Sequence, residues 1–465
     1  MVDLEVVLGL VLGPLIICYG LLKWNEVRYK KKGMPPGTMG WPLFGETTEF
    51  LTQGHDFMKK QKARYGNLFK THMLGSPTVI CLDPELNKYI LMNEWKGLVP
   101  GYPKSMQDLM GKWNISRVRG SLHKSMRSAM LGRMGPNMIK DGLISEFDEF
   151  LRTHLGSWSG KVIDIQEKTE ELWVLSTLKQ IVGIENDVIA QELKSELTNF
   201  VSGTLSLPIY FPGTNYYRGF QARRKIVSIL EKLIKEKKAS PSSQNCMLDY
   251  LLRYDDDTEA KFSDEQVIDL AVTTVYSGFE TVSTTTMMAI KYLYEHPRAL
   301  EEIRNEQFGI RNRKSPEDML DWNDYKYMNF TRAVILETLR LATVINGVLR
   351  QATKDIELKG YIIPKGWRIY VYIREINYDP SMYPEPLEFN PWRWLDENLE
   401  SHQHFLVFGG GGRLCPGKEL GMVEIATFLH HFVTKYRWEE VGDNKIQKFP
   451  RVEAPNGLHI RVWDY

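Results

Sequence analysis

The segment at residues 408–417 constrains this chain more than any other, because it fixes the surroundings of one cysteine. It reads Phe-Gly-Gly-Gly-Gly-Arg-Leu-Cys-Pro-Gly and places Cys415 after a glycine-rich bend, directly before an expected helix. Glycines let a backbone approach a flat ligand where side chains would collide. A cysteine at a helix N-terminus is stabilised as the thiolate, because free N–H groups and the helix dipole favour negative charge. The segment therefore predicts a metal-binding thiolate.

Haem iron suits this arrangement, because the macrocycle can lie against the glycines while the sulfur of Cys415 binds the iron. Arg413 can contact a haem propionate, and Phe408 can cover the ring near the sulfur. The alternative is a lone buried cysteine in a glycine-rich turn. We favour the haem ligand, since the motifs described below agree with it.

Composition excludes several other classes of protein. The 465 residues include 59 Lys and Arg against 58 Asp and Glu, which gives no sign of a polyanionic partner. There is no phosphate-binding loop, zinc-type cluster or nucleic-acid motif, so we expect no nucleic-acid partner. Length alone would suggest about three domains, but motifs spread from Pro35 to Gly417 have to converge on one site. Four scattered cysteines form no disulfide framework and suit a reducing compartment: Cys18, Cys81, Cys246 and Cys415.

The N-terminus differs in composition from the rest of the chain. An apolar run extends from Val6 to Leu22, with acidic residues before it and the basic residues 30–32 after it. This pattern predicts a short transmembrane helix with the C-terminal side in the cytosol. A cleaved signal peptide is the alternative, but the run lacks a basic N-terminal flank and a small-residue cleavage site. We expect a membrane anchor with its basic flank over residues 1–32, a stiff connector rich in Pro and Gly at 33–45, and one catalytic domain over 33–465.

The remaining chain is mostly helical in pattern, which predicts a mainly α fold. One long helix is expected between Ser263, a good N-cap, and Pro297. It would be roughly 45 Å long, enough to cross a whole domain. Short strands are expected at residues 78–82, 361–363, 368–372 and 458–462, and surface loops at 238–245 and 254–260.

Residues 277–281 of the long helix combine a glycine with polar side chains. Gly278 costs about 1 kcal/mol relative to alanine in a helix, and close approach of a ligand to the backbone is one reason to keep it. Glu280 offers a carboxylate and Thr281 a hydroxyl that could relay protons during oxygen activation. The pattern is weak alone, but beside the cysteine segment it predicts a catalytic role for both residues.

The cysteine segment and the Gly-Phe-Glu-Thr pattern resemble cytochrome P450, the family of haem-thiolate monooxygenases, and the resemblance covers nearly the whole chain. It implies the cytochrome P450 fold, a helical bundle around haem b with small β-sheets, here with an N-terminal transmembrane helix. It also implies electrons from NADPH through NADPH–cytochrome P450 reductase. Ser277 departs mildly from the alanine or glycine usual in the family.

The resemblance also assigns a structural network. Glu337 and Arg340 are one helical turn apart and can form an ion pair. In the family, an arginine in the position of Arg393 completes a buried Glu–Arg–Arg network that locks the cysteine loop. We interpret these three residues as structural and haem-retaining rather than catalytic.

Haem propionates need cationic or hydrogen-bonding partners. Besides Arg413, the candidates are Arg350 and the pair His123 and Arg127, which are four residues apart and share a helix face. Many family members have Trp in the position of His123. A basic surface with Lys124, Arg133 and Lys418 could dock the electron-donating flavoprotein, although a simple solvated basic face explains it equally well.

Several stretches resemble the plant brassinosteroid C-6 oxidases in more detail, namely residues 34–50, 97–103, 345–350, 374–379, 389–394 and 435–440. This resemblance implies hydroxylation at C-6 of a 6-deoxo brassinosteroid and oxidation to the 6-ketone, as from 6-deoxocastasterone to castasterone. Some relatives continue to a lactone. Residues 112–119, which should roof the substrate pocket, carry more charge than the family leads us to expect, and residues 131–140 also diverge.

The sequence thus predicts a single-pass protein of the endoplasmic reticulum membrane with a cytosolic catalytic domain and an apolar steroid substrate. The nearest alternative is a monooxygenase of another plant sterol, triterpenoid or diterpenoid. A haem-thiolate isomerase or dehydratase, or a haem- or sterol-binding protein without turnover, is disfavoured by the presence of Glu280 and Thr281.

Overall fold

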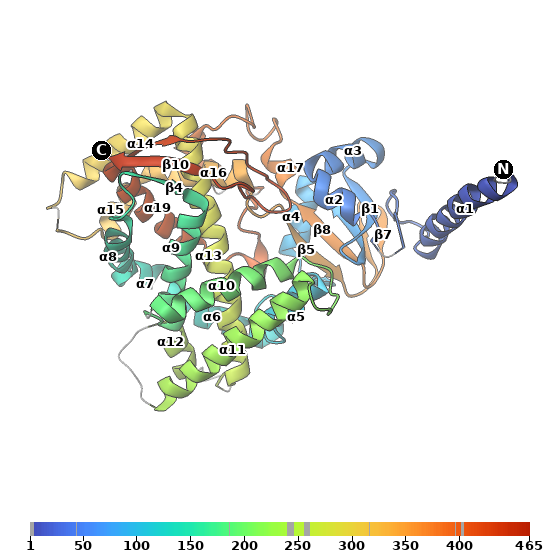
Figure 1. Ribbon diagram of the computed structural model, residues 1–465, viewed down its shortest axis with the longest axis horizontal. Coiled ribbons are helices and arrows are strands. Elements are labelled where there is room, and N and C mark those ends of the chain that lie inside the picture. The colour runs from blue at the N-terminus through green and yellow to red at the C-terminus, as the bar shows by residue number, and fades with distance from the viewer. Residues whose placement is uncertain are drawn as a thin grey trace. The chain divides into compact units, whose positions relative to one another are not determined.

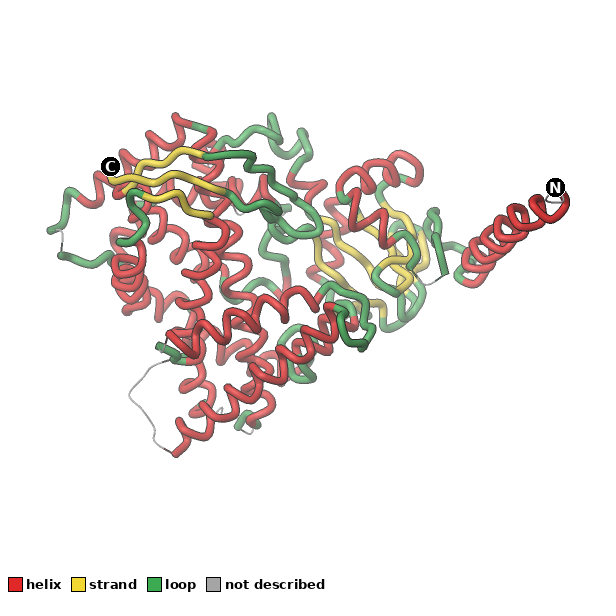
Figure 2. The backbone as a smooth tube through the Cα atoms, viewed as in Figure 1, coloured by secondary structure: helices red, strands yellow, loops and turns green. Residues whose placement is uncertain are grey.

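The structure is a computed structural model, and it describes residues 4–42, 44–185, 187–239, 246–254, 261–315, 317–395, 397–400 and 404–465. The chain divides into two compact units, each built from segments that are far apart in the sequence. Unit 1 contains Met1–Pro103, Ile345–Ile376 and Gly409–Gly412; unit 2 contains Lys104–Val344, Asn377–Phe408 and Arg413–Tyr465. Figure 1 labels the elements, and Figure 2 shows that helices dominate.

Unit 1 is built on a five-stranded sheet in the order β1-β2-β8-β5-β3, in which only β2 and β8 are parallel. The β1–β2 hairpin turns through Leu74 and Gly75, whose φ angles of 50° and 71° are those of the tight turn that matches strand twist. The strands of unit 1, including the small β6–β7 hairpin, are β1 (Leu68–Met73), β2 (Ser76–Cys81), β3 (Leu98–Pro100), β5 (Gly347–Ala352), β6 (Ile356–Leu358), β7 (Tyr361–Ile363) and β8 (Arg368–Tyr372).

The helices of unit 1 are α1 (Leu4–Arg28), α2 (Thr47–Gln53), α3 (His55–Tyr65) and α4 (Pro84–Met92), and α17 (Arg374–Asn377) ends at its boundary. Part of the expected connector after α1 is held by hydrogen bonds to that helix. The side chain of Asn25 donates to the carbonyls of Met39 at 3.1 Å and Gly40 at 2.9 Å. A side chain at Gly45 would collide with the carbonyl of His72, which explains the glycine.

Unit 2 is helical, and α13 is its longest helix (Figure 1). Ser263 caps α13 and forms a reciprocal capping box with Gln266, as expected from the sequence. Helix α9 packs along α13, and the indole of Trp173 donates to the hydroxyl of Thr286 at 3.1 Å in the buried interface. The helices of unit 2 are α5 (Lys104–Met110), α6 (Gly120–Met134), α7 (Pro136–Met138), the π-helical turn η1 (Ile139–Leu143), α8 (Ile144–Leu155), α9 (Ile165–Val182), α10 (Asp187–Thr204), α11 (Asn215–Ala239), α12 (Met247–Arg253), α13 (Asp264–Glu295), α14 (Pro297–Arg311), α15 (Trp322–Tyr327), α16 (Asn329–Ala342), η2 (Pro391–Leu395), α18 (Glu397–Glu400) and α19 (Lys418–Lys435), with the short turn η3 (Gly411–Arg413) at the unit boundary.

Helices α10 and α11 lie side by side because two glycines face each other. A side chain at Gly203 would come within 3.1 Å of the Cα of Gly219, and also close to Leu109 of α5. The sheet of unit 2 is antiparallel in the order β4-β10-β9 and consists of β4 (Lys161–Asp164), β9 (Tyr436–Glu440) and β10 (His459–Asp464).

The mainly α fold class and all four expected strands are confirmed, with boundaries that differ by a few residues. Residues 240–245 and 255–260, most of the two expected surface loops, lie outside the described residues. Within the described part of the chain, no helix combines the length and apolar character needed to cross a membrane. The division into residues 1–32 and 33–465 stays a prediction.

Candidate functional site

Cys415 lies just before α19, in a turn closed by a hydrogen bond from its own N–H to the carbonyl of Phe408 at 3.0 Å. The glycines of the segment are required by the backbone, since Gly409 and Gly411 have φ angles of 75° and 65°. The cysteine side chain is exposed. The glycine-rich bend therefore presents an accessible sulfur at a helix N-terminus, as the sequence predicted.

The surroundings of Cys415 do not by themselves favour the thiolate, because protein atoms around the accessible side chain still desolvate the sulfur. Desolvation raises the pKa of the thiol, and a hydrogen bond from Gly417 and the charges of Arg127 and Lys418 act against this rise. A bound metal ion would supply the positive charge that a thiolate at this position needs. The donor set, one accessible sulfur with cations on the same side, fits a haem iron ligand.

Helix α6 carries both His123 and Arg127, and Arg127 lies beside the cysteine segment. A guanidinium nitrogen of Arg127 donates to the carbonyl of Leu414 at 2.6 Å, next to the cysteine, while His123 is buried. The two nitrogens of Arg413 donate to the carbonyls of Ile115 and Val118 at 2.6 and 2.7 Å. Arg127 thus holds the cysteine segment to α6, and Arg413 holds it to residues 115–118, which precede α6.

Arg350 lies on β5 in unit 1, where it is buried and donates to the carbonyl of Leu349 at 3.3 Å. The propionate contacts expected of Arg350, His123, Arg127 and Arg413 stay predictions.

Glu337 of α16 is the fully buried centre of a network of hydrogen bonds. Its carboxylate accepts from Arg340 at 2.8 and 2.9 Å and from Arg393 of η2 at 3.2 Å. Glu337, Arg340 and Arg393 therefore meet as the resemblance implied. The indole of Trp394 also donates to Glu337, at 2.7 Å, and Asn390 donates its N–H at 2.9 Å.

Arg340 extends this network to the chain that follows α17. It donates to the carbonyls of Asn377, Pro386 and Glu388 at 2.6, 2.7 and 3.3 Å. Both Glu337 and Arg340 are inaccessible to solvent. The network fixes the path of the chain from α16 to η2, and its haem-retaining role stays a prediction.

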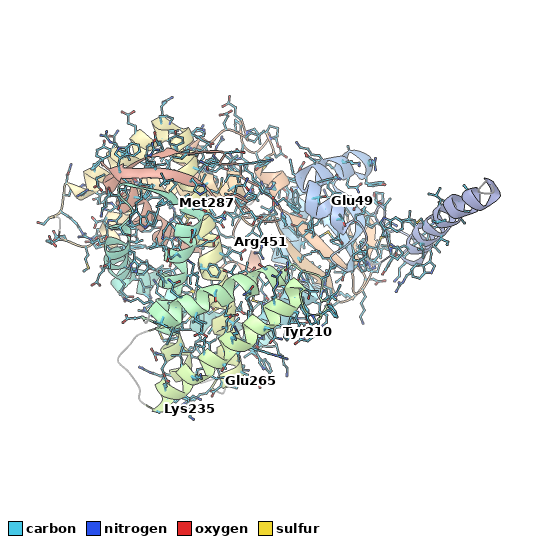
Figure 3. The ribbon with its side chains drawn as sticks, in the orientation of Figure 1. Glu49, Tyr210, Lys235, Glu265, Met287 and Arg451 are labelled. Atoms are coloured by element: carbon cyan, nitrogen blue, oxygen red, sulfur yellow. The ribbon has the colours of Figure 1, made fainter. Side chains whose placement is uncertain are left out.

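Glu280 and Thr281 are adjacent on α13, but their side chains have different partners. The hydroxyl of Thr281 donates to the carbonyl of Ser277 at 2.9 Å. Glu280 forms an ion pair of 3.2 Å with Arg451, a residue labelled in Figure 3. Arg451 also donates to the carbonyl of Val201 and the hydroxyl of Thr204 at the end of α10. The sequence did not identify Arg451, because nothing local marks a partner so far along the chain.

Gly278 has a different explanation from the ligand contact considered in the sequence. A side chain there would meet the methyl and hydroxyl of Thr177 on α9 at 3.2 and 3.4 Å. The glycine allows α9 and α13 to pack closely.

The accessible cysteine, the nearby cations and the helical fold fit a haem-thiolate protein. The cytochrome P450 family model matches residues 35–458. The chain belongs to the cytochrome P450 family. It is 61% identical to a cytochrome P450 85A1 of Brachypodium distachyon, over 99% of this chain and 100% of that protein. It is 62% identical to a cytochrome P450 85A1 of Solanum lycopersicum, over 97% of each.

Among solved structures, a retinoic acid-bound cyanobacterial CYP120A1 superposes with a TM-score of 0.85 at 26% identity, covering 93% of this chain and 99% of that one. The predicted family, its fold and the predicted class of monooxygenase are confirmed.

Proposed function

We propose that this protein oxidises C-6 of a 6-deoxo brassinosteroid, first to the 6-alcohol and then to the 6-ketone, with 6-deoxocastasterone and castasterone as the substrate and product type. The geometry of Cys415 at the start of α19 carries the monooxygenase assignment. The steroid assignment is supported by full-length identity to the P450 85A proteins and by the stretches that resemble C-6 oxidases. Each oxidation consumes one dioxygen and one NADPH and releases water.

We assign a different role in haem binding to each group of site residues. Haem b, when bound through Cys415, activates dioxygen with two electrons supplied from NADPH. We assign the binding of its propionates to His123, Arg127, Arg350 and Arg413. Phe408 closes the turn that holds the sulfur. The Glu337 network fixes the chain leading from α16 to η2.

We assign proton delivery to Thr281 and Glu280. Both lie in the middle of α13, and Glu280 is held by Arg451 at a partly exposed position where it can exchange protons with water. Thr281→Ala should continue to consume NADPH but divert more of it to hydrogen peroxide, because a proton donor at the oxygen-binding face is lost. The ratio of steroid product to NADPH consumed measures this effect, and Thr281→Ser, which keeps the hydroxyl, is the matched control. An unchanged ratio in Thr281→Ala would contradict the assignment.

We further propose that electrons reach the protein from NADPH–cytochrome P450 reductase and that α1 anchors it in the endoplasmic reticulum membrane, with the catalytic part in the cytosol. The anchor is supported by exposed apolar side chains on α1: Leu15 (59%), Ile16 (68%) and Ile17 (63%). Lysines 30–32 follow the helix, which suits a cytosolic C-terminal flank. An apolar steroid dissolved in the bilayer would then be close to the enzyme.

The deciding experiment is expression with a plant reductase and mass spectrometry of products from a panel of plant steroids, triterpenoids and diterpenoids. A 6-keto product from a 6-deoxo brassinosteroid, absent with Cys415→Ala, is the expected result. Turnover of triterpenoids or diterpenoids alone would reject the steroid assignment and keep the monooxygenase. Binding of steroids without any NADPH consumption would reject both.

A further inference from the structure

Four charged side chains gather at the start of α19, beside the cysteine segment. The ammonium of Lys418 lies 3.1 Å from Glu400 and 3.8 Å from Glu419. It also lies 5.5 Å from the centre of the Phe408 ring, within the range of a cation–π contact. Because Phe408 accepts the hydrogen bond from the N–H of Cys415, Lys418 joins this cluster to the residue that closes the cysteine turn.

Glu400 is itself fixed by Arg332. Two nitrogens of Arg332 donate to its two oxygens at 2.9 and 2.6 Å, the two-point geometry of a strong ion pair. Arg332 also donates to the hydroxyl of Tyr325 at 3.1 Å and lies 3.6 Å from Glu419. Arg332 belongs to α16, the helix that carries Glu337, so the cluster ties the cysteine segment to α16 by a route that does not use Glu337.

The cluster is partly shielded from water. The side chains of Arg332, Glu400 and Lys418 are 29%, 24% and 27% exposed. Burial opposes the charge of Glu400, but the hydrogen bond and charge of Arg332, followed by those of Lys418, outweigh it and lower the pKa of Glu400. The cations Arg332 and Lys418 balance the carboxylates of Glu400 and Glu419. Contacts within the protein therefore hold Lys418 in place, so that it is not free to bind a partner protein.

We propose that the Arg332–Glu400–Lys418 network is a second brace for the cysteine segment, which keeps the Phe408–Cys415 turn in the shape that holds the thiolate on iron. In this role Lys418 is a positioning residue, which differs from both the flavoprotein docking surface and the solvated basic face that the sequence left open. The inference rests on the proposed haem-thiolate function.

The test uses the carbon monoxide spectrum of the full-length protein after chemical reduction with dithionite, which needs no flavoprotein. The red-shifted Soret band of a thiolate-ligated haem converts to a shorter-wavelength band when the thiolate is lost. On mild warming, Lys418→Met should lose the red-shifted band about fivefold faster than the natural protein, the size expected when one partly exposed ion pair is removed. Glu400→Gln should lose it at least as fast, because it removes the pairs with both Arg332 and Lys418.

Two further variants control the experiment. Lys418→Arg keeps the charge and should lose the band at nearly the natural rate. Glu439→Gln removes the exposed pair with Arg461 in the β9–β10 sheet, 2.6 Å long in the structure, and should have no effect. The double variant Lys418→Met with Glu400→Gln should be slower than the product of the two single effects predicts, because both variants remove the Lys418–Glu400 pair.

Natural rates in Lys418→Met and Glu400→Gln, or additive effects in the double variant, would overturn the brace. If the natural protein itself showed no red-shifted band, the haem-thiolate function would be rejected. Failure of the proposed function is therefore distinguishable from failure of the proposed brace.

Discussion

At the scale of single residues, loss of the Glu337 side chain should strongly reduce both stability and haem content. Glu337→Ala removes the acceptor of Arg340, Arg393 and Trp394 and leaves the Arg340 charge buried without its carboxylate partner. Such a change costs about 3–5 kcal/mol. We expect purified Glu337→Ala to contain little haem, measured as the ratio of Soret absorbance to protein.

The control for this prediction is Glu149→Ala, which removes an exposed carboxylate from α8 in the same unit. It should keep the natural haem content. A full haem complement in Glu337→Ala would show that the network is dispensable for haem retention.

Glu424 on α19 should make stability depend on pH. The residue is buried, and desolvation raises its pKa to about 8, whereas an unfolded glutamate titrates near about 4.3. The folded state therefore holds the proton more tightly than the unfolded chain. The stability this gives is complete at acid pH and is lost as pH rises towards and through about 8.

Glu424→Gln, which has no proton to lose, should remove this dependence. The melting temperature of the natural protein should fall more steeply between pH 6 and pH 8.5 than that of Glu424→Gln. Parallel curves for the two proteins would mean that Glu424 does not keep its proton in the folded state.

The sequence marked candidate site residues but few of the side chains that contact them. Cys415, Glu337 and Arg340 are recognisable because local spacing or a resemblance marks them. Arg451 and Glu400 have no such mark, since each meets its partner only when segments far apart in the sequence have packed together. A carboxylate such as Glu280 leads us to expect a cation nearby, but only the tertiary structure shows which residue supplies that cation.

At the scale of elements, the contact between α9 and α13 depends on Gly278. Gly278→Leu should lower stability by about 1–3 kcal/mol, because a large side chain would overpack against Thr177. Gly278→Ala should be milder, since tighter packing against Thr177 is offset by about 1 kcal/mol of gained helix propensity. Thermal unfolding measures both changes.

Removing the neighbour provides the matched test of this contact. In a Thr177→Ala background, Gly278→Leu should cost clearly less, because the methyl and hydroxyl that it meets are gone. An equal loss in both backgrounds would mean that Gly278 is needed for another reason, such as the ligand contact first considered.

The elements that were predicted correctly are those with local signals. Helix α13 has a capping serine, an acidic first turn and a proline just beyond its end. Strands such as β1 and β9 were not predicted, because each is short and contains several polar residues, and pairing with a neighbouring strand stabilises it. The glycines at 203 and 219 are similar: each is an ordinary helix-weakening residue until α10 and α11 meet.

At the scale of the whole molecule, the composition and the wide spacing of the motifs along the chain predicted one catalytic region. They could not predict which segments of the chain form each of the two compact units. Residues 345–376 return to the unit that contains the N-terminal hundred residues. This return depends on pairing between strands that are far apart in sequence, such as β2 with β8, which no local pattern encodes.

The membrane anchor is the whole-molecule property that is simplest to test. Ile16 and Ile17 on α1 are mostly exposed to solvent, so polar substitution there should not disturb packing. Ile16→Asp with Ile17→Asp in the full-length chain places two charges in the proposed membrane segment, each costing about 3 kcal/mol near the centre of a bilayer. In plant cells we expect the natural protein to stay in the membrane pellet after alkaline carbonate extraction and the double variant to become soluble. Its carbon monoxide spectrum should be unchanged, because the catalytic residues lie elsewhere in the chain.

Val188→Ser, which alters an equally exposed apolar residue on α10, should stay in the pellet. Extraction of the natural protein by carbonate would instead make α1 a surface-bound helix and reject the single-pass topology.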